Sequence, residues 1–140
     1  MIISRATVSA EVGLTLVVPG RGSVPLVASL CYSADDPYAI RMAFHVGTDK
    51  PVEWTFAREL LATGLACPAG DGDVRVWPAA PGRREVLNIA LSSPSGQARF
   101  EASASATSDF LRLTYGIVAA GREDELIDVE GELGQLLRRA

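Results

Sequence analysis

Residues 52–64, VEWTFARELLATG, change their periodicity in the middle of the segment. From Val52 to Phe56 apolar and polar residues alternate, which is typical of a strand with one buried face. From Ala57 onward good helix formers follow one another until Gly64, a residue type that often ends helices. The segment therefore predicts a strand that runs directly into a short helix. The junction is either an active-site corner or a packing joint.

Three stretches before this segment alternate in the same way. They are separated by turn sequences rich in Pro, Gly and Asp, PGRGSVP at 19–25 and SADDP at 33–37. We expect three strands here, each with one apolar face. Their inward residues are Val8, Ala10, Val12, Leu14, Leu16 and Val18, then Leu26, Ala28, Leu30 and Tyr32, and then Ile40, Met42, Phe44 and Val46.

Three more strands are expected after the short helix, at residues 74–78, 86–93 and 97–103. The last two are joined by PSG at 94–96, a sequence suited to a tight hairpin. Residues 86–91 are largely apolar on both faces. We expect an interface between subunits to use a strand edge or the apolar outer faces of strands 86–91 and 6–18. The spacing of roughly eight to twelve residues per strand predicts an antiparallel meander.

The period becomes helical after Ser103. We expect a helix with Thr107 or Ser108 as its N-cap and Gly121 as its C-cap. Its apolar stripe contains Phe110, Leu111, Leu113, Thr114, Ile117 and Val118. A last amphipathic helix is expected over 126–137.

The fold class that these elements predict is α+β, in a single domain covering residues 1–140. The expected architecture is an antiparallel sheet of about six to seven strands. A short helix follows the fourth strand, and two helices stand at the C-terminus.

Composition excludes several classes of protein. A chain of 140 residues with 48% apolar content is long enough to bury one substantial core. Its net charge of −4 argues against a nucleic-acid partner, because such proteins usually present a basic face. Cys31 and Cys67 are too far apart for a CxxC motif, which favours reduced thiols in a cytoplasmic protein. No stretch approaches the roughly 18 apolar residues of a membrane span, so membrane association would need a partner protein.

The residues that could carry chemistry do not form a recognisable catalytic motif. His45 is the single histidine, and no GxSxG sequence supplies a nucleophile for it. The acids Glu53, Glu59, Asp71 and Asp73 could act as an acid and base pair, but such residues are more often solvated. Trp54 and Trp77 are more typical of a core or an interface than of stacking on bases. We expect no catalytic residues.

Binding motifs for metals and phosphates are equally weak. GDGD at 70–73 lacks the later ligands and the turn glycine of a calcium loop. PGRGSVP at 19–25 is a truncated GxGxxG with Pro25 in the last place. A zinc site would need His45 and both cysteines from three separate elements. We therefore expect no metal site and no cofactor.

Five segments taken together resemble a known family. In order they are CYSADDPYAIRMAFH (31–45), VEWTFARELLATGL (52–65), GDVRVWP (72–78), LSSPSGQA (91–98) and FLRLTYGIVAAG (110–121). This ordered set is similar to the signature blocks of the SsgA-like family of actinobacterial sporulation and cell-division regulators. VEWTFARELL followed by GDVRVWP looks most like the SsgB branch of that family.

The resemblance implies a non-enzymatic adaptor for cell division. Members of this branch mark sporulation septum sites and recruit the tubulin-like protein FtsZ, together with an SsgA-type paralogue. The expected location is the cytoplasm, at division septa. The family also implies a homo-oligomer, with a trimer favoured, and a fold similar to that of the Whirly proteins. Because Whirly proteins bind single-stranded DNA, single-stranded nucleic-acid binding is the alternative function.

Two groups of residues are candidates for contact with partners. Leu133, Leu136 and Leu137 lie on the expected C-terminal helix, which either caps its own sheet or meets a partner. Arg58 and Glu59 are expected on the solvent side of the segment at 52–64, where Trp54 and Phe56 face inward. On this interpretation the segment is a packing joint and not a catalytic corner.

Overall fold

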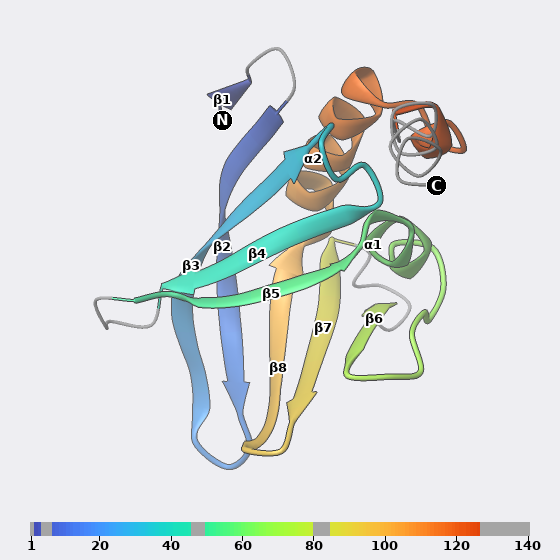
Figure 1. The fold of residues 1–140 in the computed structure, drawn as a ribbon. Helices are drawn as coiled ribbons and strands as arrows, with labels where there is room; N and C mark the ends of the chain where they lie inside the picture. The colour runs from blue at the N-terminus through green and yellow to red at the C-terminus, as the bar shows by residue number, and fades with distance from the viewer. Residues whose placement is uncertain (1, 4–6, 46–49, 80–84, 127–140) are drawn as a thin grey trace, which may run out of the picture.

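The computed structural model describes residues 2–3, 7–45, 50–79 and 85–126, and Figure 1 shows a curled sheet with helices at one end. Every strand pair in the sheet is antiparallel. The strands are β1 (Ile2–Ile3), β2 (Thr7–Val18), β3 (Gly22–Ser33), β4 (Ala39–His45), β5 (Val52–Ala57), β6 (Val74–Pro78), β7 (Val86–Ser93) and β8 (Gly96–Ser103). The described helices are α1 (Arg58–Gly64), α2 (Ala104–Ile117) and the 3₁₀ turn η1 (Glu123–Leu126). The predicted α+β class with an antiparallel sheet is confirmed.

The order of the strands is β5-β4-β3-β2-β8-β7-β6, with β1 added beside β2. Strands that follow one another in sequence pair within β2 to β5 and within β6 to β8, as predicted for a meander. A single meander from the first strand to the last is wrong, because β8 returns to pair with β2. After β5, helix α1 carries the chain away from its own edge of the sheet. Strand β6 therefore starts at the opposite edge (Figure 1).

Alternation along β2, β3 and β4 fixes which side of the sheet is buried. The residues predicted to face inward are almost fully buried in the middle of each strand, whereas Glu11 and Arg41 between them are exposed. Leu16, Val18 and Leu26 are only half-buried, since they lie near the β2–β3 turn. Val46 falls outside the described residues. The predicted inner faces are otherwise confirmed.

Contact between two aromatic rings shows how strongly the sheet curls. Phe44 of β4 and Phe100 of β8 stack with ring centroids 4.7 Å apart and an interplanar angle of 25°. Two strands, β3 and β2, separate β4 from β8 in the order of the sheet. Rings that far apart on a flat sheet could not touch, because neighbouring strands are about 4.8 Å apart. The inner face is therefore concave, and the core fills it.

Helix α1 connects the two edges of the curled sheet. It follows β5 directly and packs against β6, so the segment 52–64 forms the predicted joint. Leu61 is fully buried, and Gly64 lies against the side chain of Val76. Any Cβ atom at position 64 would stand 2.6 Å from the Cβ of Val76, in addition to a closer clash with its Cγ1. The glycine that ends the helix is thus also a packing requirement.

Helix α2 begins and ends earlier than its sequence indicated. Its N-cap is Ser103, whose hydroxyl accepts a hydrogen bond from the Ala106 amide at 3.1 Å, so the predicted caps Thr107 and Ser108 are wrong. The helix follows β8 without a loop, and Ser103 is the first residue able to cap it. Its C-cap is Val118, and the predicted cap Gly121 instead occupies a turn with φ +83°.

The buried stripe of α2 matches the prediction. Phe110, Leu111, Thr114 and Val118 are buried, and Leu113 and Ile117 pack at its margin. The stripe faces β2 and β8 at the end of the sheet that also holds α1 (Figure 1). Of the predicted helix at 126–137, residues 127–137 lie outside the described residues, and Leu126 closes the turn η1. The predicted likeness to the Whirly fold stays a prediction.

Two glycine substitutions test the α1–β6 packing. Replacing a helical glycine by alanine usually stabilises a helix, by up to about 1 kcal/mol. We expect that gain for Gly116→Ala in α2, where nothing lies within 4 Å of the added atom. Gly64→Ala should instead lower the free energy of unfolding by about 1–3 kcal/mol through overpacking against Val76. Urea unfolding measures both, and equal stabilisation by the two substitutions would contradict the packing described.

Candidate functional site

The most unusual side chain of the described structure is Arg58, the first residue of α1. Its exposed fraction is 1%, and by volume it is the largest of the fully buried side chains. The prediction that Arg58 lies on the solvent side is therefore wrong. Glu59, the next residue, is exposed as predicted.

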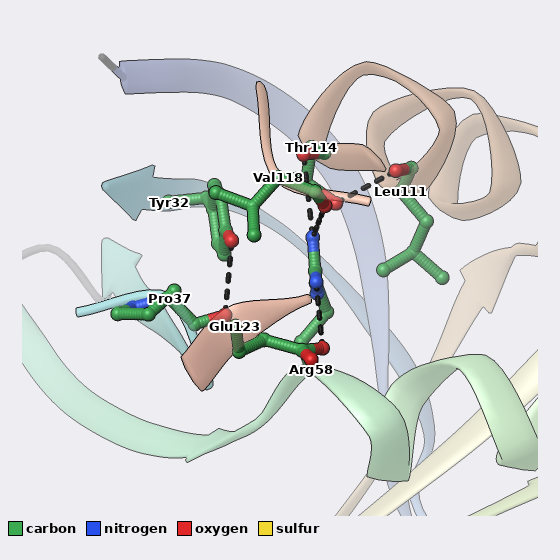
Figure 2. A network of polar contacts seen from close by, with 7 residues as sticks. All are labelled: Tyr32, Pro37, Arg58, Leu111, Thr114, Val118 and Glu123. Carbon is green, nitrogen blue, oxygen red and sulfur yellow. Dashed lines mark hydrogen bonds and ion pairs between the residues drawn. The ribbon is translucent and has the colours of Figure 1, made fainter. Parts of the chain in front are cut away.

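Three acceptors surround the guanidinium group of Arg58 (Figure 2). Its Nη1 donates to the carbonyl oxygens of Thr114 at 3.2 Å and Val118 at 2.7 Å. Its Nη2 donates to Oε1 of Glu123 at 2.8 Å, forming an ion pair. Both carbonyls belong to the C-terminal end of α2, where a positive charge is favoured, and that of Thr114 also accepts the amide of the C-cap Val118 at 3.0 Å. Arg58 therefore caps α2 from a different element.

Two aromatic rings complete the surroundings of the cation. The guanidinium carbon lies 4.5 Å from the ring centroid of Tyr115 and 4.9 Å from that of Tyr32. Such distances give cation–π attraction, which strengthens when water is excluded. Tyr32 in turn donates its hydroxyl to the Pro37 carbonyl oxygen at 2.9 Å, and the Arg58 amide donates to the Tyr38 carbonyl oxygen at 2.7 Å. The cluster thereby joins β3, the turn before β4, α1 and α2.

The ionisation of the cluster follows from these contacts. The hydrogen bond from Arg58 lowers the pKa of Glu123 below that of a free glutamic acid. The pair is therefore charged at neutral pH. Any stability that it contributes is present above the pKa of the unfolded chain and is lost as the pH falls through the lowered value. Burial raises the pKa of Tyr32, although the charge of Arg58 acts in the opposite direction, so the phenol is neutral.

The Arg58 cluster has a structural role. Beside the ion pair lies a recess of about 260 Å³, lined by Tyr38, Glu59, Tyr115, Ala120 and Gly121. The carboxylate of Glu123 is already bound to Arg58. Glu53, Asp71 and Asp73 are exposed and do not line the recess, so the predicted alternative of an acid and base pair finds no partner for Glu59 there.

Sequence alone did contain a signal for the burial of Arg58. The strand period of two places Trp54, Phe56 and Arg58 on one face, and the helical period places Arg58 on the same stripe as Leu61. Both periods therefore indicate an inward side chain. The opposite expectation followed the general rule that arginine is rarely buried without a partner. Its partner, Glu123, is 65 residues away in sequence, and no local pattern connects the two.

An apolar groove lies at the other end of β5, away from α1. Its volume is about 350 Å³, and its wall comes from several strands of the concave face. The apolar lining residues are Leu16, Leu26, Phe44, Val52, Trp54, Leu91, Ala98 and Phe100. No arginine or lysine is among the residues that line it, so the groove lacks the basic side chains that usually bind a nucleic-acid backbone.

The remaining predicted candidates are scattered over the surface. His45 is exposed, and its Nε2 lies 2.9 Å from the hydroxyl of Ser29 on the neighbouring strand. Cys31 and Cys67 are both free thiols. Among residues 2–3, 7–45, 50–79 and 85–126, no three His, Cys, Asp or Glu side chains come together in a way that could hold a metal. In the same ranges no helix is long and apolar enough to cross a membrane.

The outer faces of β2 and β7 carry polar as well as apolar residues, and their predicted part in an interface between subunits stays a prediction. On β7 and β8 the outer face carries Asn88, whose side-chain oxygen accepts a hydrogen bond from Arg99 at 2.6 Å. On β2 it carries Thr7, Ser9, Glu11 and Thr15. Leu133, Leu136 and Leu137 lie outside the described residues, so their predicted role at an interface stays a prediction.

Comparison with known proteins identifies the family. The family model described as Streptomyces sporulation and cell division protein, SsgA, matches residues 26–123. The sporulation-specific cell division protein SsgB of Thermobifida fusca is 56% identical over 137 residues, which are 98% of this chain and 99% of that protein. SsgB of Streptomyces coelicolor is 48% identical over 133 residues, which are 95% of this chain and 97% of that protein.

Solved structures of two related proteins have the same fold as this chain. The crystal structure of the SsgA-like sporulation-specific cell division protein from Thermobifida fusca superposes with a TM-score of 0.83 at 55% identity, covering 96% of this chain and 98% of that one. A structure of SsgB from a study of longitudinal cell division during sporulation of Streptomyces coelicolor superposes with a TM-score of 0.81 at 49% identity. The match covers 86% of this chain and 95% of that one.

The fold and the sequence together define a sporulation and cell-division protein. The chain belongs to the SsgA family, as the five sequence blocks predicted. The relatives described above are SsgB proteins, in agreement with the predicted branch. Neither the comparisons nor the groove supports the alternative of nucleic-acid binding.

Replacing Arg58 tests its structural role. Arg58→Met keeps most of the side-chain volume but removes the donors to two carbonyls and the partner of Glu123. We expect the free energy of unfolding to fall by about 3 kcal/mol, the scale for removing one member of a buried pair. The control Arg112→Met removes an exposed arginine of α2, whose ion pair with Asp109 is solvated, and should change stability by less than about 0.5 kcal/mol. Chemical denaturation distinguishes the two, and equal effects would contradict the assignment.

Proposed function

We propose that this chain is a non-enzymatic cell-division adaptor that marks sporulation septum sites and recruits FtsZ. The observation that carries the proposal is 56% identity, over nearly the whole chain, to a protein named sporulation-specific cell division protein SsgB. The family resemblance supplies the role in marking septa and the partner FtsZ. An adaptor acts by contact, so its activity resides in surfaces and not in a reactive centre.

The chemistry of the described residues supports an adaptor. The buried cation Arg58 donates to two helix carbonyls and a carboxylate of its own chain and lies against two rings, so these bonds serve the fold. The apolar groove contains no charged side chain that would orient a small polar ligand. His45 has a serine neighbour, but no acid among the described residues is hydrogen-bonded to its ring. These features favour contact over catalysis.

The partners follow from the same proposal. FtsZ is the polymer that the adaptor recruits, and an SsgA-type paralogue acts with it. The chain works in the cytoplasm at division septa and reaches the membrane through a partner protein. No cofactor takes part. Of the predicted contact residues, Glu59 is exposed and available to a partner, whereas Arg58 is buried and is not proposed as a contact.

Co-sedimentation with FtsZ polymers tests recruitment and the C-terminal leucines together. Wild-type protein should pellet with FtsZ polymers assembled with GTP and remain in the supernatant without them. Leu136→Asp places a charge on the apolar face that the sequence predicts, and it should reduce pelleting several-fold if that face meets the partner. The control Gln135→Asp adds the same charge one position earlier, on the predicted polar face, and should pellet like wild type.

The melting temperature of Leu136→Asp distinguishes loss of a partner contact from loss of folding. Lost pelleting with an unchanged melting temperature identifies the leucine face as a contact surface. Lost pelleting with a lowered melting temperature shows that the same leucines cap the chain's own sheet. If the wild-type chain does not pellet with FtsZ over a range of salt and nucleotide conditions, recruitment by direct contact is refuted.

Oligomeric state is a separate test. We propose a closed, symmetric homotrimer, because the family resemblance favours it and symmetric closure is the usual form of such assemblies. Gel filtration with light scattering should give a mass of about 44 kDa, three times the 14.8 kDa of one chain. A species with the mass of a single chain at micromolar concentration would show that the trimer is wrong.

A further inference from the structure

An exposed tyrosine and an exposed glutamate border the recess beside the Arg58–Glu123 pair. Tyr38 is 45% exposed, and Glu59 is exposed as well. Within the described ranges, no hydrogen bond or ion pair engages the hydroxyl of Tyr38 or the carboxylate of Glu59. A single exposed side chain of either kind is ordinary. Here the two line one concave site of about 260 Å³, and both are free to bind.

The fold holds the aromatic walls of this recess in place. Tyr38 precedes β4, and its carbonyl oxygen accepts the Arg58 amide at 2.7 Å. Tyr115 of α2 is half-buried, and its ring lies 4.5 Å from the guanidinium carbon of Arg58. The side chain of Arg58 also binds the carbonyl of Thr114, the residue before Tyr115. Arg58 therefore positions both rings, one through its backbone and one through its side chain.

The charges that line the recess leave one negative charge unmatched. Arg58 lines it with an exposed fraction of only 1%, and its charge is matched by Glu123 at 2.8 Å (Figure 2). Glu59 is the additional carboxylate, and it has no cation beside it among the described residues. An anionic group would meet two carboxylates here, whereas a cationic group would meet one free carboxylate and aromatic rings. The recess therefore favours a cation.

We propose that this recess, lined by Tyr38, Glu59 and Tyr115, is the docking point for an arginine side chain of the partner protein that the adaptor recruits. The existence of that partner rests on the proposed function. A planar guanidinium group can stack on an aromatic ring and bind a carboxylate through two donors at once, which an ammonium group cannot do. Arginine and tyrosine are also the residue types that most often dominate the binding energy of interfaces.

A titration followed by two-dimensional amide NMR tests the recess without any partner protein. The probe is Nα-acetyl-arginine amide, and Nα-acetyl-citrulline amide is its uncharged analogue of the same shape. The arginine probe should shift the amide signals of Glu59 and Gly121 in a saturable way, and the citrulline probe much less. Glu59→Gln should weaken binding of the arginine probe several-fold. The control Glu53→Gln removes an exposed charge of β5 that does not line the recess, and it should bind like wild type.

Pelleting with FtsZ polymers tests whether the recruited partner uses the recess. Glu59→Lys places a positive charge where the arginine would bind, so pelleting should fall several-fold relative to wild type. Glu53→Lys makes the same change of charge outside the recess and should pellet like wild type. Both variants should keep the wild-type melting temperature, because both positions are exposed.

Three outcomes would overturn the proposal. Equal shifts with the arginine and citrulline probes would show that the recess does not select a cation. Equal weakening by Glu59→Gln and Glu53→Gln would assign binding to net charge. Normal pelleting of Glu59→Lys, when the wild type pellets, would exclude the recess as the docking point. If the wild type does not pellet, recruitment itself fails, and the NMR titration still decides whether the recess binds arginine.

Discussion

A buried guanidinium group organises the end of this molecule where sheet and helices meet. Arg58 places a full positive charge at the C-terminal end of α2 and between two tyrosine rings, and its backbone amide binds the turn before β4. An isolated buried charge would be very costly, so the position is tenable because two carbonyl oxygens, a carboxylate and two rings surround the group. That requirement fixes α1 relative to α2, and α1 in turn connects both edges of the curled sheet.

The curl and the joint depend on each other. A sheet whose edge strands are β5 and β6 leaves two unpaired edges, and α1 can pack on β6 after β5 only if the sheet bends far enough to bring those edges together. Stacking of Phe44 on Phe100 across the concavity shows that it does. The close approach of Gly64 to Val76 then sets how near the helix lies to the opposite edge. Because α1 and α2 fill one end of the concave face, the apolar groove remains at the other.

Local sequence patterns predicted the strands well, because a period of two with one buried face depends on neighbours along the chain. They predicted less of the structure where it depends on contacts between segments that are distant in sequence. The pairing of β8 with β2 joins residues more than 80 positions apart, and no turn sequence encodes it. Ser103 caps α2 because β8 leads into the helix without a loop, so the later candidates Thr107 and Ser108 are already inside it. The burial of Arg58 agreed with both local periods, but only the distant Glu123 and the end of α2 make it physically acceptable.

The buried cluster also bears on how a protein of this kind works. An enzyme must keep its charged groups reachable by substrate, and such groups are commonly only partly satisfied before the substrate arrives. Here the buried charge is satisfied by the chain's own carbonyls, rings and carboxylate, with its one solvent-facing partner on the segment that leads into the C-terminus. In the adaptor proposed above, a charge arranged in this way has a structural task, which is to hold α1, α2 and η1 together.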